Sequence, residues 1–505
     1  MLTHHIPMHV SRFARVVILL LAALALQAAP LFAQGPADDT LRLHPDNPHY
    51  FLWRGKAAAL ITSAEHYGAV LNLDFDFRKY LDALAADGLN YTRIFTGSYV
   101  EKPGAFGIAR NTLAPAEGRF LAPWARSGTP GYAGGGEKFD LDRWNPEFFA
   151  RLREFVAEAD RRGIVVEVTL FCSTYTDTGW SVNPLNPANH VNGGSLTDWR
   201  KLNTLGNGDV LARQEALTRK IVQELNGAAN VFYEIQNEPW ADNHAMGDAI
   251  NPYLSKPQGF PNAVEITAPV SVEWQARVAA WIADAERALP RKHLVAQNIA
   301  NFRLAVRESD IAPGVSILNF HYAYPEAATW NLGLGKLLGY DETGFAGSAD
   351  ATYRREAWAF VLAGGGIYNN LDYSFSVGRE DGAGPAAEAP GGGSAALRRQ
   401  LGVLSKFVHS FDLAAMSPDF SAVKNSPGVV TRTLSAPGKA YAIYAVGRSP
   451  TRLSLALPAG AYTAEWLNVA TGEIVKSEEF THAHGARELP SPEFKEEIAL
   501  RVKAK

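Results

Sequence analysis

The sequence predicts an α/β fold, a (β/α)8 TIM barrel followed by an antiparallel β-sandwich, and three observations support this. Between residues 57 and 371, eight short apolar runs alternate with amphipathic helical segments. Such repeats imply parallel strands with right-handed crossovers, and eight of them favour a closed barrel over an open doubly wound sheet. Long segments follow the second, third and fourth strands. Beyond residue 412, short alternating runs punctuated by Gly and Pro indicate antiparallel strands. We expect the barrel over residues 34–411 and the sandwich over 412–505.

The strands of the barrel are marked by short apolar runs. We expect them, in chain order, at Ala57–Thr62, Leu89–Phe95, Ile164–Phe171, Asn230–Gln236, His293–Gln297, Val315–Phe320, Lys336–Tyr340 and Gly364–Leu371.

Capping residues and helical spacing mark the helices between these strands. The segment Asp74–Asp87 carries apolar residues at helical spacing and ends before Gly88. Asn145 caps the next helix and places Pro146 at its first position, where proline is favoured. Further helices are expected at Asp209–Leu225, Val270–Leu289 and Ser394–Phe411.

The first 33 residues have the pattern of a secretory signal peptide. Arg12 and Arg15 precede the apolar run Val16–Leu26, and small residues lead to a cleavage site at Ala33. The run is too short to span a bilayer. We therefore expect export of a soluble chain to the periplasm or the medium.

Composition excludes several classes of protein. The chain has 505 residues, of which 47% are hydrophobic, and a formal net charge of −4. These values are typical of globular proteins, and the near-neutral balance argues against a nucleic-acid partner. Cys172 is the single cysteine, so an intramolecular disulfide and a cysteine-based metal cluster are excluded. We expect neither metal nor cofactor, and the sequence leaves the oligomeric state open.

Two carboxylates follow strands that face each other across the barrel. Glu238 lies in Asn237-Glu238-Pro239 at the exit of the fourth strand, and Glu342 follows the seventh. Two carboxylates on opposite sides of one bond are what glycoside hydrolysis requires, and Asn237 can hold a substrate hydroxyl. Asp341 is the alternative to Glu342, because adjacent strand residues point to opposite faces and one of the two is expected to face the site.

These motifs resemble those of glycoside hydrolase clan A, the retaining (β/α)8 hydrolases that include family 5 cellulases and mannanases. The resemblance implies that Glu238 is the acid/base and Glu342 the nucleophile. Arg93 in Thr-Arg-Ile-Phe matches an arginine at the end of strand two, and His321-Tyr322 matches an element of strand six. The resemblance implies that Tyr322 hydrogen-bonds the nucleophile and that Arg93 orients it.

The chain departs from family 5 at two places. Phe171-Cys172-Ser173 stands where a histidine is expected after strand three, and Asn369–Ser374 contains no tryptophan on strand eight. The segment His44–Phe51, the loop Glu65–Gly68 and the C-terminal sandwich resemble cellulase-like bacterial proteins, including apiosidase-like barrels.

Further substrate contacts are expected in the loops after strands one, four and eight. The alternatives are a loop-stabilising hydrogen-bond cluster for the first group and core packing for the tryptophans, which include Trp124 and Trp180 in the long loops. The candidates are Glu65, His66, Tyr67, Trp240, Asn370, Asp372 and Tyr373.

The sequence thus predicts a secreted retaining glycoside hydrolase acting on a poly- or oligosaccharide. A non-catalytic glycan-binding barrel and a transglycosylase on the same site remain alternatives. The long loops favour a closed pocket and exo action, although they equally fit a narrow cleft. The C-terminal sandwich is expected to support the barrel, with a carbohydrate-binding module as the alternative.

Overall fold

The structure is a computed structural model that describes residues 39–249, 263–385 and 390–505. The predicted signal peptide, residues 1–33, lies outside the described residues. Thr40–Lys505 form one compact unit. Within the described part of the chain, no helix has both the length and the apolar character needed to cross a membrane.

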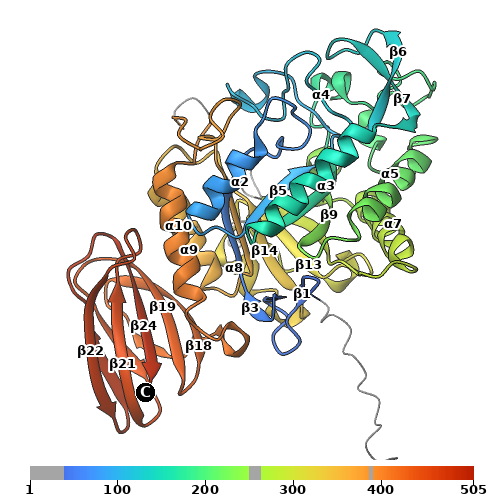
Figure 1. The fold of residues 1–505 in the computed structure, drawn as a ribbon. Helices are drawn as coiled ribbons and strands as arrows, with labels where there is room; N and C mark the ends of the chain where they lie inside the picture. The colour runs from blue at the N-terminus through green and yellow to red at the C-terminus, as the bar shows by residue number, and fades with distance from the viewer. Residues whose placement is uncertain (1–38, 250–262, 386–389) are drawn as a thin grey trace, which may run out of the picture. The chain divides into compact units, whose positions relative to one another are not determined.

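Eight parallel strands form the nearly closed barrel that the sequence predicts (Figure 1). Their hydrogen-bonded order is β4-β15-β14-β13-β12-β9-β8-β5. In chain order the strands are β4 (Leu60–Ala64), β5 (Tyr91–Phe95), β8 (Val165–Cys172), β9 (Val231–Asn237), β12 (Val295–Asn301), β13 (Ile317–His321), β14 (Leu337–Glu342) and β15 (Ile367–Leu371).

One side chain bridges the seam between β4 and β5, the two ends of that hydrogen-bonded order. The Asn90 Nδ2 atom donates to the Ala59 carbonyl at 2.9 Å, and its Oδ1 accepts from the Ile61 amide at 2.8 Å. Asn90 therefore supplies, from just before β5, the pairing that a strand ladder supplies elsewhere in the barrel.

The predicted helices are present, and side-chain caps begin three of them, one being the expected cap Asn145. Asp76 caps the helix after β4, Asn145 caps the next with Pro146 at its first position, and Ser394 caps the last. The longer helices are α2 (Phe77–Ala86), α3 (Pro146–Arg161), α5 (Val210–Leu225), α7 (Pro269–Glu286), α9 (Asp350–Val361) and α10 (Ala395–Val408). Shorter ones are α4 (Asp177–Val182), α6 (Pro239–Asp242) and α8 (Pro325–Thr329).

The first predicted strand, Ala57–Thr62, is wrong in its start and combines parts of two elements. Its beginning belongs to β3 (Lys56–Ala58), which forms a three-stranded sheet with β1 (Arg42–Leu43) and β2 (Phe51–Trp53), whereas β4 starts at Leu60. The two-residue turn Arg54-Gly55 has positive φ at both residues, as type I′ hairpins require. The apolar side chains of this sheet pack against residues at the beginnings of the barrel strands and close that end.

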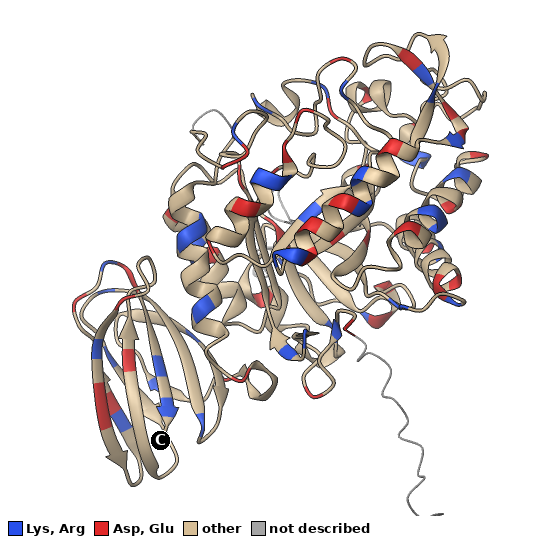
Figure 2. Cartoon of the chain, in the orientation of Figure 1, with Lys and Arg blue, Asp and Glu red and all other residues tan. Residues whose placement is uncertain are grey.

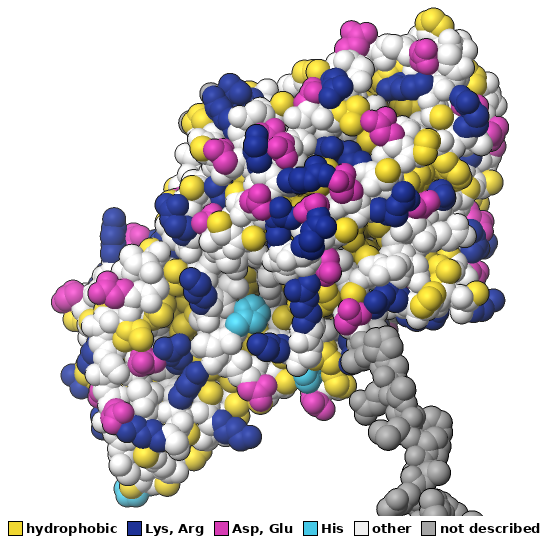
Figure 3. Space-filling view, viewed as in Figure 1, with side chains coloured by type: hydrophobic (Ala, Val, Ile, Leu, Met, Phe, Trp, Pro, Cys, Tyr) yellow, Lys and Arg dark blue, Asp and Glu magenta, His cyan; other side chains and the backbone are white. Residues whose placement is uncertain are grey.

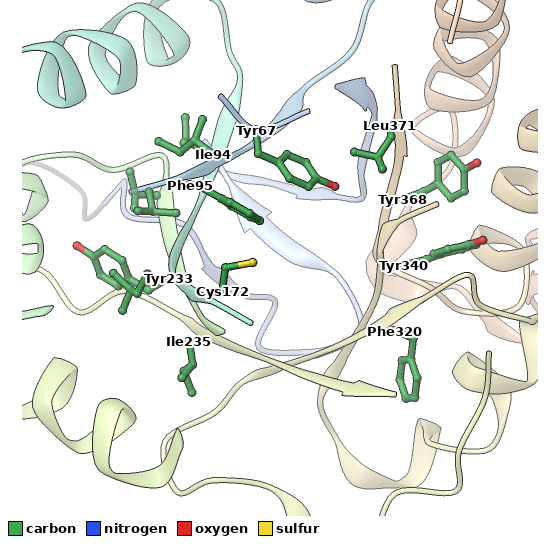
Figure 4. Packing of buried hydrophobic residues seen from close by; sticks show 14 of the residues in the cluster. Tyr67, Ile94, Phe95, Cys172, Tyr233, Ile235, Phe320, Tyr340, Tyr368 and Leu371 are labelled. Carbon is green, nitrogen blue, oxygen red and sulfur yellow. The ribbon is translucent and has the colours of Figure 1, made fainter. Parts of the chain in front are cut away.

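Side chains of the barrel region lie on two sides of the strands. Tyr340 and Tyr368 point from their strands toward the surrounding helices, whereas Tyr67, Phe95 and Cys172 lie inside the ring of strands (Figure 4).

Outside the barrel, charges of both signs are interspersed along the helices (Figure 2) and over the face in Figure 3.

Two antiparallel sheets follow the barrel and confirm the predicted sandwich. The larger has the order β16-β18-β19-β24-β21-β22 and the smaller β17-β20-β23, and one apolar cluster contains residues from both. The ring of Tyr444 in β19 stacks on Trp358 of α9, with centroids 5.4 Å apart. The strands are β16 (Ser417–Pro418), β17 (Val423–Asn425), β18 (Val429–Ala436), β19 (Ala440–Gly447), β20 (Arg452–Ala456), β21 (Gly460–Leu467), β22 (Ile474–His482), β23 (Ala486–Pro490) and β24 (Glu497–Ala504).

Two of the long loops carry antiparallel hairpins that the sequence did not predict. The loop after β5 contains β6 (Trp124–Pro130) and β7 (Glu137–Trp144). After β9, β10 (His244–Ala249) pairs with β11 (Ala263–Thr267), which in turn pairs with β12. These segments follow the strand ends that carry the candidate site.

Candidate active site

Glu238 directly follows β9 in a strained backbone conformation. Its φ is 47°, and Pro239 then begins α6. The Glu238 amide donates to Asn298 Oδ1 at 2.9 Å. Its carboxylate accepts two hydrogen bonds, from His321 Nδ1 to Oε1 at 2.9 Å and from the Tyr175 hydroxyl to Oε2 at 2.9 Å. Hydrogen bonds at its backbone amide and at its carboxylate therefore hold Glu238 in position.

Glu342 is the last residue of β14 and has its own pair of donors. The Tyr322 hydroxyl donates to Oε1 at 3.1 Å, and Arg93 Nη1 donates to Oε2 at 3.0 Å. Both oxygens are thus oriented, and the residue is 6% exposed.

The two carboxylates lie close together. One oxygen of Glu238, one oxygen of Glu342 and a ring nitrogen of His321 all lie within 4.8 Å of one another. Retaining glycosidases separate their carboxyl groups by about 5–5.5 Å and inverting ones by about 6.5–9.5 Å. The 4.8 Å limit joins the nearest oxygens of the two carboxylates, and it is compatible with the retaining spacing.

The expectation that Asp341 and Glu342 face opposite sides is wrong, because the strand bulges. The register between β13 and β14 shifts between Phe320 and His321, and His321 pairs with Glu342. An extra residue at a bulge breaks the alternation of side chains. Asp341 Oδ2 lies 3.4 Å from Arg93 Nη2, and Asp341 Oδ1 lies 3.5 Å from His321 Nε2. Both carboxylates therefore reach the interior, Asp341 beneath the pocket and Glu342 in its wall.

Arg93 connects the site to the barrel interior. It is fully buried, and it donates to Glu234 through Nε at 2.9 Å and to Asn237 Oδ1 through Nη2 at 2.8 Å. Its guanidinium carbon lies 4.7 Å from the centroid of the Tyr67 ring. Arg93 thereby orients Asn237 and Glu342 at the same time.

Burial and neighbouring charge separate the protonation states in this network. Burial raises the pKa of Glu234 to about 7, although Arg93 opposes the shift. Burial would also raise the pKa of Asp341, but Arg93 and His321 outweigh it and lower the value to about 2. Burial opposes charge on His321, yet the carboxylates of Glu342 and Asp341 raise its pKa well above the usual value. These surroundings therefore favour the charged forms of both Asp341 and His321.

Tyr175 is a site residue that sequence reasoning missed. Its hydroxyl accepts from Asn237 Nδ2 at 2.7 Å and donates to Glu238, so it links the two adjacent residues. It stands three residues beyond Cys172, close to where the resemblance lacked a histidine. The sequence offered one signal, an aromatic residue just past a strand exit, but many loops contain one.

The two carboxylates line a pocket whose unfilled space, counted together with the solvent at its mouth, is about 370 Å³. His66, Glu101, Leu113, Cys172 and Asn237 contribute to its wall. The remaining lining residues are aromatic, namely Tyr67, Phe95, Tyr99, Phe106, Tyr175, Tyr322 and Phe345.

Backbone strain is concentrated around this pocket. Among the described residues, nine that are not glycine have positive φ, and six of these line the pocket. Each such residue costs roughly 1–2 kcal/mol, and strain of this kind clusters at functional sites. The six are Tyr67, Phe106, Tyr175, Glu238, Tyr322 and Phe345.

The predicted residues fall into three groups by position. Asn237, Glu238, Tyr322 and Glu342 line the pocket, together with His66 and Tyr67. Arg93 and His321 lie directly behind it. Arg93 donates to Glu342, and His321 is hydrogen-bonded to Glu238. The other predicted residues do not reach the pocket wall.

Five residues for which substrate contact was expected lie outside the pocket wall and contact neighbouring side chains or backbone. Glu65 is buried and accepts hydrogen bonds from the amides of Gly68 and Ala69 at 3.0 Å. These bonds stabilise the loop, which is the alternative role that the sequence left open for this residue. Asp372 is buried and accepts from Ser63 at 2.9 Å and Arg398 at 2.8 Å. Asn370 contacts Ser63. Trp240 packs edge-on against His321, and the ring of Tyr373 lies 5.9 Å from that of His66.

Trp124 and Trp180 also pack rather than project into the pocket. They are 1% and 8% exposed, respectively. The aromatic surface of the pocket comes instead from tyrosines and phenylalanines, so tryptophan positions in the sequence were the wrong guide.

Two groups of side chains around His321 have spacing that could suit a metal ion. One contains Glu238 and Glu342, and the other Glu234 and Asp341. The guanidinium of Arg93 contacts three of these four carboxylates. The positive charge of Arg93 therefore already offsets the negative charge of these carboxylates, which is the role that a divalent cation would have there.

The sequence matches no family model and no curated protein. Solved structures do match. One is a glycoside hydrolase family 5 protein from Bacteroides vulgatus, with a TM-score of 0.58 and 13% identity over 92% of this chain and 94% of that chain. A second, described as a glycoside hydrolase, has a TM-score of 0.59 and 13% identity over 92% and 97%.

The chain shares the fold of these proteins. The aligned 92% of the chain is longer than the barrel, so the likeness includes the C-terminal sheets. At 13% identity the likeness concerns the fold, and the chemistry has to be argued from the site.

Proposed function

We propose that this protein is a retaining glycoside hydrolase that cleaves the O-glycosidic bonds of an oligo- or polysaccharide by double displacement. The observation that carries the proposal is the pair Glu238 and Glu342, within 4.8 Å of each other and held by different donors. The fold shared with glycoside hydrolases supports the same class of reaction.

In the first step Glu342 attacks the anomeric carbon while Glu238 gives its proton to the leaving oxygen. The bond between the anomeric carbon and that oxygen breaks, and a glycosyl ester forms on Glu342. Tyr322 and Arg93 hold the attacking carboxylate in place. Asn237, anchored by Arg93 and Tyr175, is positioned to hold a substrate hydroxyl.

In the second step water displaces Glu342. Glu238, now ionised, takes a proton from the water, whose oxygen bonds to the anomeric carbon as the ester bond breaks. His321 and Tyr175 hold the Glu238 carboxylate in place for this step as they do for the first.

The proposal also places the reaction outside the cytoplasm. The basic residues, apolar run and small residues of positions 1–33 support export. Expression of the full chain, followed by N-terminal sequencing of the mature protein, checks this. A mature chain in the cytoplasm that retains residue 1 would contradict it.

A panel of aryl glycosides and neutral and acidic oligosaccharides tests the activity itself. Wild type should hydrolyse at least one substrate, while Glu342→Gln and Glu238→Gln should each lose at least about a thousand-fold in kcat. Glu380→Gln, a change at a glutamate outside the pocket wall, is the control, and circular dichroism checks the fold of every variant. Binding without hydrolysis by wild type would favour a glycan-binding barrel, and longer products would favour a transglycosylase.

A further inference from the structure

We propose that Asp242, which lies outside the pocket wall, is a positioning residue for the proton donor and holds Tyr175 against Glu238. The inference rests on the proposed function and deepens it, because it names a residue that controls proton transfer without touching substrate. It is carried by the hydrogen bonds of the Asp242 carboxylate, by the backbone of Tyr175 and by the contact of that tyrosine with Glu238.

The Asp242 carboxylate joins the segments that follow β8 and β9. Asp242 is the last residue of α6 and is 7% exposed. The Thr174 amide donates to both of its oxygens, to Oδ1 at 2.9 Å and to Oδ2 at 2.8 Å. The Tyr175 amide donates to Oδ1 at 3.0 Å. One carboxylate therefore accepts from two consecutive amides of the loop after β8, which fixes the direction in which that loop leaves the strand.

Tyr175 needs such an anchor because its backbone is strained. Its φ of 64° lies in the left-handed region, which is unfavourable for a residue other than glycine. A strained conformation of this kind persists only where the surrounding structure holds it. The amide of Tyr175 itself is one of the two groups that donate to Asp242, so the carboxylate acts directly on the strained residue.

Tyr175 in turn positions the proton donor. Its hydroxyl donates to Glu238 Oε2 at 2.9 Å and accepts from Asn237 Nδ2 at 2.7 Å. A hydrogen bond to a carboxylate favours its ionised form, which Glu238 adopts once its proton has moved to the leaving oxygen. A shift of Tyr175 would therefore change both the direction of the Glu238 side chain and its readiness to release the proton.

A neutral hydrogen bond also joins the two loops, so joining them does not by itself require a buried carboxylate. The Ser173 hydroxyl donates to the Glu238 carbonyl at 2.7 Å. Burial raises the pKa of Asp242 to about 7, although the amides of Tyr175 and Thr174 oppose the shift. A carboxylate that is kept in such a place at a cost in stability indicates a role in function.

Cys172 reports the position of Tyr175 without any substrate. It is the single cysteine of the chain, it is 5% exposed, and its Sγ lies 3.8 Å from the Tyr175 hydroxyl. In Asp242→Ala, a chromogenic disulfide reagent should modify this thiol at least about five-fold faster than in wild type, because the loop opens more often. Asp242→Asn, which keeps one acceptor oxygen, should react at a rate between the two.

The matched control for the thiol reaction is Asp177→Asn. Asp177 lies in the same loop but accepts from Trp199 Nε1, at 2.7 Å. Its rate should equal that of wild type, and circular dichroism checks the fold of each variant. An unchanged rate in Asp242→Ala, or an equal rise in the control, would overturn the inference. Asp242→Asn carries the comparison if the alanine variant does not fold.

Kinetics test whether this link serves proton donation. The probes are the phenyl and dinitrophenyl glycosides of the sugar that the panel identifies, of which only the phenyl glycoside needs a proton on its leaving group. Asp242→Asn should lower kcat/KM for the phenyl glycoside about ten-fold more than for the dinitrophenyl glycoside. The basic limb of its pH profile, which reports loss of the Glu238 proton, should move to higher pH, because the ionised form loses a donor.

The outcomes separate this inference from the proposed function. Equal losses on both glycosides with an unmoved basic limb would show a merely structural role for Asp242 and overturn the inference, while the hydrolase proposal stands. If wild type hydrolyses no glycoside, the proposed function fails and the role in proton donation fails with it. The thiol reaction then still decides whether Asp242 holds Tyr175.

Discussion

At the scale of single residues, the site depends on groups that each serve both carboxylates. His321 lies 2.9 Å from Glu238 Oε1 and 3.6 Å from Glu342 Oε1. Arg93 contacts Glu342 directly and reaches Glu238 through its neighbour Asn237. A positive group between two carboxylates reduces the repulsion between them, which allows the close spacing that double displacement needs.

Asp341 acts as a positioning residue that keeps His321 charged. Asp341→Asn should lower the pKa of His321, because the buried imidazole would lose one of the carboxylates that favour its charged form. The titration of the His321 ring, followed by NMR in the full chain, measures this. Asp310→Asn, at a surface position, is the control, and an unchanged pKa in Asp341→Asn would contradict the role.

Tyr322 orients Glu342 through a single hydroxyl. Tyr322→Phe removes the 3.1 Å hydrogen bond and keeps the ring, so kcat/KM should fall by about ten- to a hundred-fold with little change in stability. Steady-state kinetics on the substrate found in the panel give the answer. A variant as active as wild type would show that Arg93 alone suffices to orient Glu342.

At the scale of elements, the Asn90 side chain makes two hydrogen bonds across the seam of the barrel. Asn90→Ala would leave the Ile61 amide and the Ala59 carbonyl without their partner. Leaving such groups unpaired should lower the free energy of unfolding by about 2–4 kcal/mol. Urea denaturation measures the change, with Asn425→Ala in the exposed part of β17 as the control. A loss no larger than that of the control would mean that packing and the backbone hydrogen bonds between these segments are enough to hold the seam.

The loop after β5 should respond to pH through the pair His66 and Glu101. The imidazole of His66 lowers the pKa of Glu101 against the effect of burial, and Glu101 raises the pKa of His66 in the same way. The stabilisation is full between the unfolded values of about 4.3 and 6.5. It is lost as pH falls through the lowered pKa of Glu101 or rises through the raised pKa of His66.

Glu101→Gln should therefore destabilise the protein more at pH 5.5 than at pH 9. Chemical denaturation of wild type and variant at the two pH values measures the difference. A larger loss at pH 9 would contradict the assigned charges.

At the scale of the whole molecule, the C-terminal sheets and the barrel belong to one compact unit. Arg354 of α9 pairs with Glu497 of β24, where the side chains are 12% and 2% exposed. Glu497→Gln would leave the guanidinium without its charge partner and should cost about 3 kcal/mol. Calorimetry should show one unfolding transition at a lower temperature, and two separate transitions in wild type would contradict a single cooperative unit.

Periodicity and capping were sufficient to predict the barrel, because eight strands and their helices each repeat a strong local pattern. The carboxylates Glu238 and Glu342 could be predicted because they stand at strand ends. The bulge at Asp341, the link through Tyr175 and the wall at Glu101 depend on contacts between distant segments, which leave no local pattern. The positions of Glu65 and Asp372 outside the pocket wall could not be predicted, because hydrogen-bond clusters that hold loops use the same residue types as substrate sites.

The central claim is that Glu238 and Glu342 act in sequence through a glycosyl ester. The most direct test is proton NMR of the first product formed from the substrate that the panel identifies, before the sugar equilibrates between its anomers. Double displacement predicts that this product has the same anomeric configuration as the substrate. A product of inverted configuration would contradict the account, because it requires water to attack in a single step.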